Sequence, residues 1–495
     1  MNAIVKDRSA ALPLKDSKLF RDRAYVNGEW VEADSRKRID VDNPADGSVL
    51  GSVPDMGGAE TRRAIDAANA ALPAWRALPA KERSRLLRKW YDLILAHADD
   101  LALLLTTEQG KPLAEAKGEI TYGASFVEWF AEEAKRVYGD VIPSPTNDRR
   151  LIVLKQPIGV CAAITPWNFP NAMITRKVAP GLAAGCTFVL KPAEQTPYSA
   201  LALAELAERA GIPKGVLNIV TGDPVAIGQE LCANPVVRKL TFTGSTEVGR
   251  ILMRQSADTI KKLSLELGGN APFVVFDDAD LDAAADGALA SKYRNAGQTC
   301  VCANRIYVQD KVYDAFAAKL AERIKAFKVG KGTEAGVNIG PLIDEQGMKK
   351  VEDHVADAVA KGAKVVLGGH RHALGGRFFE PTLLTEMKTG MKVAREETFG
   401  PVAPLFRFKD DEEAIRLAND SEFGLCAYFY SRDVGRIFRA AEALEAGIVG
   451  VNVGIISNEV APFGGVKQSG LGREGSKYGI EEFLEIKYVC LGGIQ

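Results

Sequence analysis

The chain has 495 residues, a length that predicts about three domains at roughly 150 residues each. A hydrophobic fraction of 46% and a charged fraction of 26% are those of an ordinary globular protein, which excludes collagen, coiled coil and wholesale disorder. The net charge of -1 provides no field that would attract nucleic acid or an anionic membrane. With 7 cysteines lacking disulfide spacing and no targeting segment, we expect a cytoplasmic protein in a reducing compartment.

The first part of the chain predicts an arm, a hairpin and several helices. Residues 1–20 are expected to form a loosely held arm. Asn27 and Gly28 lie between apolar residues, a pattern typical of a tight hairpin. From about residue 59 to residue 140 the apolar residues recur at helical spacing, and residues 110–112 (GKP) predict the end of a helix.

After residue 151, short apolar runs alternate with helical segments. Between two of these runs, Thr196 is expected to cap a helix, Pro197 to lie in its first turn and Gly211 to end it. Strand, helix and strand at this spacing predict a mostly parallel sheet covered on both faces. The expected strands are residues 151–154, 160–164, 187–190, 217–220 and 240–243.

A second alternating region, from residue 273 to residue 452, predicts a second α/β unit. The last predicted strand, residues 483–490, alternates polar and apolar side chains. A strand at the end of a chain needs a partner edge, and another subunit is one candidate.

Cys300 lies in residues 295–302 (NAGQTCVC), between a predicted helix and a predicted strand. A cysteine after a glycine-containing turn can be presented to a pocket. The alternative is that it packs as a small hydrophobic residue, which is the commoner role of a single cysteine. Cys302 suggests a metal pair, but neither a matching CxxC nor a histidine is near, so we expect no metal.

Glu266 and Asn168 are candidates for the other chemical roles. Glu266 ends a predicted strand just before two glycines, where a carboxylate can reach a cleft and act as a general base; the alternative is an exposed strand carboxylate. Asn168 lies between the prolines of residues 166–170 (PWNFP), which would hold its amide stiffly, as an oxyanion donor requires. The alternative for this segment is an ordinary proline-rich turn.

Two segments suggest a nucleotide site. Lys191 and Glu194 follow a parallel strand, where Glu194 could accept the ribose hydroxyls and Lys191 could also reach the ribose. Gly244 and Ser245 run from a strand into a helix, so their backbone N–H groups could bind pyrophosphate. Residues 470–475 match GxGxxG by letter but follow no hydrophobic strand, so we expect a glycine-rich loop there.

Taken together and in order, these motifs resemble the aldehyde dehydrogenase superfamily over almost the whole chain. The segments that carry the resemblance are residues 166–170 (PWNFP), 191–194 (KPAE), 242–246 (FTGST), 265–269 (LELGG), 297–300 (GQTC), 397–401 (ETFGP) and 462–465 (PFGG). Within that superfamily the details look closest to the succinate-semialdehyde dehydrogenases. The shared details are the paired cysteines Cys300 and Cys302 and residues 173–177 (MITRK), 293–295 (YRN), 454–457 (GIIS) and 472–478 (GREGSKY).

The resemblance implies an α/β fold of the aldehyde dehydrogenase type with three parts. These are a Rossmann-type NAD(P)-binding domain (1–140 and 160–268), an α/β catalytic domain (269–477) and oligomerisation strands (141–159 and 478–495). It implies a homodimer or homotetramer. It also implies cofactor contacts from Thr165, Pro166, Trp167, Lys191, Ala193, Glu194, Gly244, Ser245, Leu267, Glu397 and Phe399.

The implied reaction is oxidation of an aldehyde by way of a thioester on Cys300. The Cys300 thiolate attacks the aldehyde, Asn168 and the Cys300 N–H hold the oxyanion, and Glu266 activates the water that releases the acid. Because Glu194 would repel a 2′-phosphate, we expect NAD, with some use of NADP through Lys191. Cys302 either packs or forms an easily reduced disulfide with Cys300 that switches activity off.

For the substrate, the resemblance implies an aldehyde with a distal carboxylate, most simply succinate semialdehyde. Arg176 and Arg294 match the positions that grip this carboxylate, with Ser457 beside them, and buried arginines need an anion to offset their burial. Three alternatives stay open. One is glutarate semialdehyde, which is longer by one methylene; the others are a cysteine hydrolase or acyltransferase without a nucleotide, which would want a histidine, and a non-enzymatic binding module.

Overall fold

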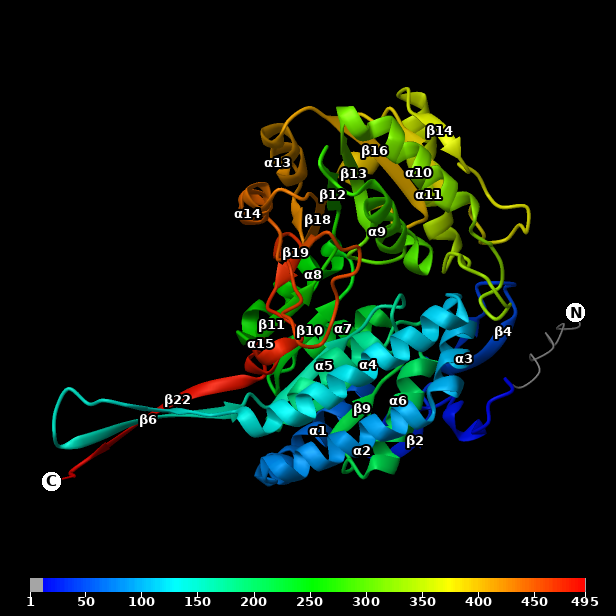
Figure 1. The fold of residues 1–495 in the computed structure, drawn as a ribbon. Coiled ribbons are helices and arrows are strands. Elements are labelled where there is room, and N and C mark those ends of the chain that lie inside the picture. The colour runs from blue at the N-terminus through cyan, green and yellow to red at the C-terminus, as the bar shows by residue number, and fades with distance from the viewer. Residues whose placement is uncertain (1–11, 495) are drawn as a thin grey trace, which may run out of the picture.

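The computed structural model describes residues 12–494. Figure 1 shows two bodies, each built around a sheet with helices packed on it, and a long β-arm that projects from one of them. The predicted α/β fold is confirmed, since both large sheets are mostly parallel. No helix of the described part of the chain is long and apolar enough to span a membrane.

The beginning of the chain is anchored more firmly than the sequence predicts. The expected arm is described only from residue 12 onward, because residues 1–11 lie outside the described residues. In the described part Leu19 is buried, and the N–H groups of Lys15 and Asp16 donate to Asp100 at 2.9 and 2.8 Å. The prediction of a loose arm is therefore wrong for this part, because a carboxylate 84 residues along the chain binds it.

The predicted hairpin is confirmed, and so is the first parallel sheet except for residues 151–154, which lie in the antiparallel strand β6 (Arg149–Pro157) outside this sheet. Asn27 and Gly28 have φ angles of 53 and 77° between β1 and β2, as a two-residue hairpin turn requires. The sheet has the order β2-β1-β9-β8-β7-β10-β11-β21, and its strands from β9 to β11 are parallel. The strands are β1 (Ala24–Val26), β2 (Glu29–Val31), β7 (Val160–Ile164), β8 (Thr187–Lys191), β9 (Leu217–Ile219), β10 (Val237–Thr243), β11 (Lys262–Glu266) and β21 (Gly470–Leu471).

Helices cover both faces of this sheet because its central strands are buried on both sides. In β7, Val160 and Ala162 face one hydrophobic cluster, whereas Cys161 and Ala163 face another. The first cluster contains α1 (Gly58–Ala77), α7 (Pro224–Ala233) and α8 (Thr246–Ser256). The second contains α2 (Ala80–Ala96), α3 (Ala98–Gln109), α4 (Leu113–Glu133), α5 (Ala172–Ala184) and α6 (Tyr198–Ala210).

The start of α6 differs from the prediction. Thr196 does not cap it, since its Oγ1 has no partner among the described residues, and the helix begins after Pro197. The carboxylate of Glu108 on α3 accepts the N–H groups of Tyr198 and Ser199 instead, each at 2.8 Å. A cap from a distant helix leaves no local signal. The predicted end is confirmed, with Gly211 in the left-handed conformation at φ 90°.

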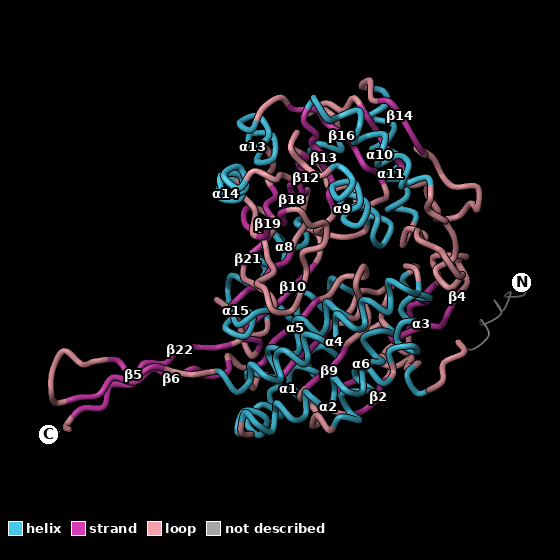
Figure 2. The backbone as a smooth tube through the Cα atoms, in the orientation of Figure 1, coloured by secondary structure: helices cyan, strands magenta, loops and turns pink. Residues whose placement is uncertain are grey.

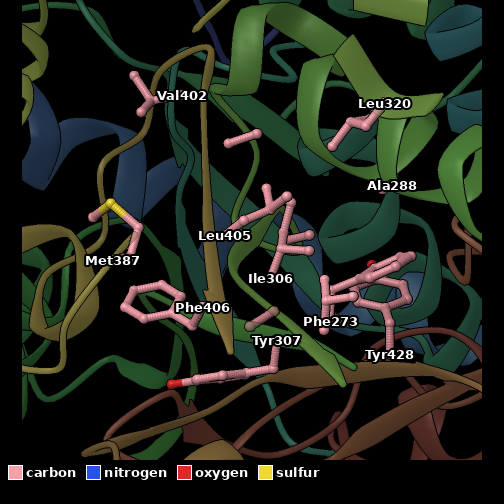
Figure 3. Close-up of a cluster of buried hydrophobic side chains, with 14 of the residues drawn as sticks. Phe273, Ala288, Ile306, Tyr307, Leu320, Met387, Val402, Leu405, Phe406 and Tyr428 are labelled. Atoms are coloured by element: carbon pink, nitrogen blue, oxygen red, sulfur yellow. The ribbon is translucent and has the colours of Figure 1, made fainter. Parts of the chain in front are cut away.

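The second sheet has the order β14-β15-β16-β13-β12-β18-β19, with only β14 antiparallel to its neighbour. Figure 3 shows the buried side chains that pack on it, among them Phe273, Ile306, Leu405 and Tyr428. Its strands are β12 (Ala271–Val275), β13 (Ala303–Gln309), β14 (Lys364–Leu367), β15 (Thr382–Thr385), β16 (Val402–Phe408), β18 (Cys426–Tyr430) and β19 (Ile448–Val451). Its helices are α9 (Leu281–Tyr293), α10 (Tyr313–Lys325), α11 (Glu345–Ala360), α12 (Lys392–Arg395), α13 (Asp411–Asn419) and α14 (Val434–Ala443).

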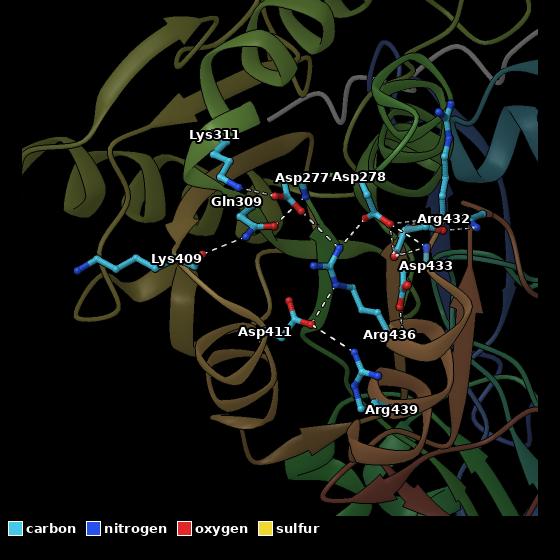
Figure 4. Close-up of polar contacts among 12 residues, drawn as sticks. Asp277, Asp278, Gln309, Lys311, Lys409, Asp411, Arg432, Asp433, Arg436 and Arg439 are labelled. Carbon is cyan, nitrogen blue, oxygen red and sulfur yellow. Dashed lines mark hydrogen bonds and ion pairs between the residues drawn. The ribbon is translucent and has the colours of Figure 1, made fainter.

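A polar network joins the ends of these elements on the surface (Figure 4). The guanidinium of Arg436 on α14 donates to Asp278, after β12, at 2.7 Å and to Asp411 on α13 at 3.0 Å. Asp278 in turn accepts the N–H groups of Arg432 and Asp433 at 2.8 Å. The network holds α13 and α14 against the sheet whose strand β13 follows the segment of Cys300.

The arm consists of β5 (Asp140–Ile142), β6 (Arg149–Pro157) and β22 (Leu484–Gly492) in one antiparallel sheet. Figure 2 shows these strands, in magenta, extending away from the helices. The short α15 (Ser476–Glu481) links the end of the second body to β22. Two further strand pairs are β3 (Arg38–Asp42) with β4 (Val49–Pro54), and β17 (Phe423–Gly424) with β20 (Val466–Lys467).

Candidate active site

A cavity of about 330 Å³ lies where the ends of several strands of the two bodies meet. It receives Asn168 from the loop after β7, Gly244 and Ser245 from the turn after β10, and Cys300 from the segment before β13. Glu397 and Phe399 close another side. The carboxyl ends of parallel strands are where open α/β sheets bind ligands, so this cavity is the candidate active site.

Cys300 is half-buried on the wall of this cavity. Burial raises the pKa of its thiol to about 12, and the nearby Glu397 carboxylate adds to the increase, whereas Arg176 lowers it. With this raised pKa the thiol is neutral at pH 7. Among the described residues, no histidine forms a hydrogen bond with the Cys300 thiol. The one buried histidine, His354, contacts Thr398 and Glu396 instead. This arrangement lacks the base that a cysteine hydrolase would need.

The Asn168 amide is held rigidly, but by hydrogen bonds as well as by its prolines. Its Nδ2 donates to the carbonyl of Gln298 at 3.0 Å, which leaves one amide hydrogen for a ligand. Its backbone carbonyl accepts hydrogen bonds from Lys111 Nζ at 2.7 Å and from Asn295 Nδ2 at 2.9 Å. These bonds connect the Asn168 loop directly to the segment that carries Cys300.

Glu266 ends β11 and is buried, so the alternative of an exposed strand carboxylate is wrong. Neither carboxylate oxygen has a hydrogen-bond partner among the described residues. Burial raises the pKa of Glu266 well above its ordinary value, with Glu474 adding to the increase and Lys177 opposing it. A Cβ on Gly464 would lie 2.9 Å from Glu266 Oε1, so the glycine of residues 462–465 leaves room for this side chain.

Arg176 lies on α5 with its guanidinium fully buried. It forms an ion pair with Glu474 at 2.6 Å, and Lys177 pairs with the same carboxylate. Glu474 therefore offsets part of the burial of Arg176, but Lys177 shares this carboxylate, so the three groups keep one net positive charge. This role of Glu474 has no signal in the local sequence, although the residue lies in residues 472–478, one of the segments that carry the resemblance.

Arg294 and Ser457 lie near this pair. Arg294 is half-buried, with its guanidinium 5.2 Å from the ring centre of Phe169, and it forms no ion pair with any residue from 12 to 494. Tyr122 on α4 accepts a hydrogen bond from Arg176 at 3.4 Å, and burial raises its pKa while a hydrogen bond with Ser457 lowers it. Tyr122 thus joins Arg176 to Ser457, a role with no signal in the local sequence.

Ser245 caps α8, with its Oγ accepting the Val248 N–H at 3.3 Å, so a helix N-terminus points at the cavity. Gly244 also lines the cavity, but its N–H donates to the carbonyl of Glu266 at 3.1 Å. The prediction that the Gly244 N–H binds a pyrophosphate is therefore wrong, because this N–H is already used within the chain.

Glu397, Phe399 and Trp167 form another part of the cavity lining. Glu397 accepts the Gly269 N–H at 3.2 Å, and burial raises its pKa to about 7. Phe399, at φ 56°, packs edge-on against Trp167 with ring centres 5.5 Å apart. Pro166 and Leu267 complete this part of the lining. An aromatic wall, an acidic group for hydroxyls and a helix N-terminus for phosphate together suit a dinucleotide.

The remaining predicted cofactor residues lie at the end of β8, beside this cavity but outside its lining. Lys191 ends the strand and forms an ion pair with Glu194. Thr165 is buried and donates its N–H to the carbonyl of Lys191 at 3.1 Å, while Ala193 is buried in the following turn. Burial lowers the pKa of Lys191, and Glu194 opposes that decrease.

Comparison with known proteins agrees with this site. A model described as "Aldehyde dehydrogenase family" matches residues 30–489. This chain belongs to the aldehyde dehydrogenase family. The chain is 69% identical to a glutarate-semialdehyde dehydrogenase of Pseudomonas aeruginosa, over 98% of this chain and 100% of that protein. It is 68% identical to the NADP(+) succinate-semialdehyde dehydrogenase GabD of Escherichia coli, over 97% of this chain and 100% of that protein.

A solved structure resembles this aldehyde dehydrogenase in both fold and sequence. The succinate-semialdehyde dehydrogenase of Burkholderia pseudomallei superimposes with a TM-score of 0.97 at 67% identity, covering 97% of this chain and 100% of that one. The resemblance stated from the sequence and the implied fold are therefore confirmed.

The raised pKa of Cys300 predicts how this thiol reacts in the cofactor-free aldehyde dehydrogenase. Far below a pKa of about 12, the thiolate fraction rises about tenfold for each pH unit. The rate of Cys300 alkylation by iodoacetamide, followed by mass spectrometry of its peptide, is expected to rise about tenfold per unit from pH 7 to pH 9. Cys300→Ser is the control for labelling elsewhere, and a plateau below pH 8 would contradict the prediction.

Proposed function

We propose that this aldehyde dehydrogenase oxidises succinate semialdehyde to succinate with a nicotinamide dinucleotide. The observation that supports the proposal is that Cys300 and Asn168 line one cavity of about 330 Å³, while the buried Glu266 lies close enough to Cys300 to raise the pKa of its thiol. The test is the increase in absorbance at 340 nm when the protein is mixed with succinate semialdehyde and NAD or NADP. No absorbance change with either cofactor would contradict the proposal.

The residues act in two stages. The Cys300 thiol first loses its proton to solvent, which Arg176 and Arg294 favour because both lower its pKa. The thiolate then attacks the aldehyde carbon, and the free Asn168 amide hydrogen and the Cys300 N–H stabilise the resulting oxyanion, worth about 3 kcal/mol per donor in comparable sites. Loss of the aldehyde hydrogen as hydride from this adduct leaves a thioester on Cys300. The bound nicotinamide supplies the hydride acceptor. Glu266, with its raised pKa, then accepts a proton from the water that hydrolyses the Cys300 thioester, and the carboxylic acid leaves.

The distal carboxylate of the substrate would be bound near Arg176, Arg294, Tyr122 and Ser457. Glu474 is shared between Arg176 and Lys177, so the positive charge left for a ligand comes from this group, with one net charge, and from Arg294. Relatives with names for both the succinate and the glutarate substrate support an acid semialdehyde. One methylene is worth only about 1–3 kcal/mol, so glutarate semialdehyde is the second candidate.

Replacement of Arg294 is expected to raise the KM for an aldehyde with a carboxylate more than the KM for an uncharged aldehyde. Because a charge-assisted hydrogen bond is worth about 1.5–3 kcal/mol, Arg294→Gln should raise the KM for succinate semialdehyde by about 10- to 100-fold. The KM for butanal, which has the same length and no carboxylate, should change by less than about threefold. Arg176→Ala is the companion variant, and equal losses on both aldehydes would refute the carboxylate site.

The cofactor preference is proposed to depend on the Lys191–Glu194 pair. As it stands, Glu194 both repels a 2′-phosphate and neutralises Lys191, which favours NAD; the NADP(+) in the name of one relative supports some use of NADP.

Glu194→Gln should remove the repulsion and free the ammonium of Lys191. The ratio of kcat/KM for NADP to that for NAD is expected to rise by about tenfold, which corresponds to roughly 1.4 kcal/mol. The control is Glu247→Gln on the exposed side of α8. An unchanged ratio would show that this carboxylate does not set the preference.

We also propose that residues 141–159 and 478–495 join subunits, with residues 1–140 and 160–268 forming the cofactor domain and residues 269–477 the catalytic domain. Strand β22 is an edge strand whose side chains Ile486, Tyr488 and Leu491 are exposed. A long apolar edge of this kind pairs readily with another chain. A homodimer or homotetramer is the proposed assembly.

Charges on this edge are expected to break the assembly. Ile486→Asp combined with Tyr488→Asp should shift the mass measured by light scattering toward that of a monomer, 53.3 kDa. The control is Tyr138→Asp, an exposed aromatic residue just before the arm. A wild-type protein that already elutes as a monomer would contradict the proposed assembly.

A further inference from the structure

A strained turn directly precedes the candidate nucleophile. Asn295, Ala296 and Gly297 have φ angles of 52, 53 and 77°, so three consecutive residues are left-handed and two of them carry a Cβ. Such a run is unfavourable for L-residues and persists only where surrounding groups hold it. Cys300 follows this turn by three residues, so the path of the turn sets where its thiol points.

Neighbouring loops hold the far side of the turn. A Cβ on Gly297 would lie 2.1 Å from the carbonyl oxygen of Gly400, which shows how closely the turn packs on the loop after Phe399. Asn295 Nδ2 donates to the Asn168 carbonyl at 2.9 Å, and Gln298 Oε1 accepts the Ile343 N–H at 2.9 Å. All these contacts are between neutral groups.

The near side of the turn is held by the carboxyl group of an acidic side chain. Glu115, in the first turn of α4, accepts the backbone N–H of Asn295 at 2.7 Å. Among the bonds that the described residues make to the turn, this one alone has an ionisable acceptor. Hydrogen bonds to a carboxylate are roughly twice as strong as bonds between neutral groups.

Several charged groups face Glu115. Lys111, which holds the Asn168 carbonyl, and Arg294, at the start of the turn, lower the pKa of Glu115, whereas burial, the largest effect, and Glu119 raise it. Asp286 on α9 lines the same cavity of about 340 Å³ as Glu115 and Arg294. Glu115 therefore lies between the group that fixes the proposed oxyanion donor and the proposed substrate arginine.

We propose that Glu115 is a positioning residue that fixes the left-handed turn and thereby aims the Cys300 thiol. This inference rests on the proposed function for the role of Cys300. Glu115 touches no reacting atom itself, and it acts through the backbone of Asn295.

The experiment compares Glu115→Leu, Glu115→Gln and wild type, with Glu132→Leu, exposed at the far end of α4, as the matched control. Glu115→Leu should lower kcat and the rate of Cys300 alkylation each by about tenfold, while the KM for the cofactor stays within about twofold. Glu115→Gln keeps an acceptor oxygen and should restore both rates to within about threefold of wild type. The control should match wild type in every measurement.

Wild-type rates in Glu115→Leu, or a cofactor KM that rises as much as kcat falls, would overturn the proposal. Where the Leu variant does not fold, Glu115→Asp replaces it, because it keeps the charge and withdraws the oxygen by one methylene. A lower alkylation rate in that variant supports the proposal, and a wild-type rate overturns it. Alkylation needs no substrate, so a wild-type enzyme that oxidises no aldehyde would end the proposed function and leave this test standing.

Discussion

The buried ion pair between Lys111 and Glu119 connects most of the parts that build the site. The two groups lie 2.6 Å apart with side chains almost completely inaccessible to water. Lys111 also donates to the Asn168 carbonyl, and Glu119 accepts the N–H groups of Asn171 and Ala172 at the start of α5. Removing one partner of such a pair typically costs about 3–5 kcal/mol, because the other is left buried and uncompensated. Here that loss would fall on the loop that carries Asn168.

A second group of buried charges depends on the first through α5. This helix carries Arg176 and Lys177, and both pair with Glu474, close to Glu266. The Glu474 carboxylate has a lowered pKa, since its two cations outweigh the effect of burial. Glu266 has no such partner among residues 12–494, and burial raises its pKa instead. The pKa values of two neighbouring carboxylates thus shift in opposite directions, an arrangement typical of sites that use acid–base chemistry.

The local parts of this fold could be predicted from the sequence. The apolar runs give the parallel strands, Asn27 and Gly28 give the hairpin, and Gly211 ends its helix. The candidate site could also be predicted, because motifs at the ends of parallel strands meet at one edge of the sheet. Pairings between residues far apart in the sequence could not be predicted. Glu108 caps α6 from 90 residues away, and Glu474 reaches Lys177 across 297 residues. Neither leaves a periodic or local signal.

If Arg176 and Arg294 bind the substrate carboxylate as proposed, they would link the charge of the substrate to the reactivity of the Cys300 thiol. Arg176 and Arg294 both lower the pKa of Cys300, whereas Glu397 and Glu266 raise it. A bound carboxylate near the arginines would screen part of their effect and so oppose thiolate formation. In the proposed site, recognition of an acidic substrate and activation of Cys300 would therefore compete for the same positive charge. That competition is weakest if the carboxylate contacts Tyr122 and Ser457 as well, because neutral hydroxyl donors bind an anion without neutralising a guanidinium.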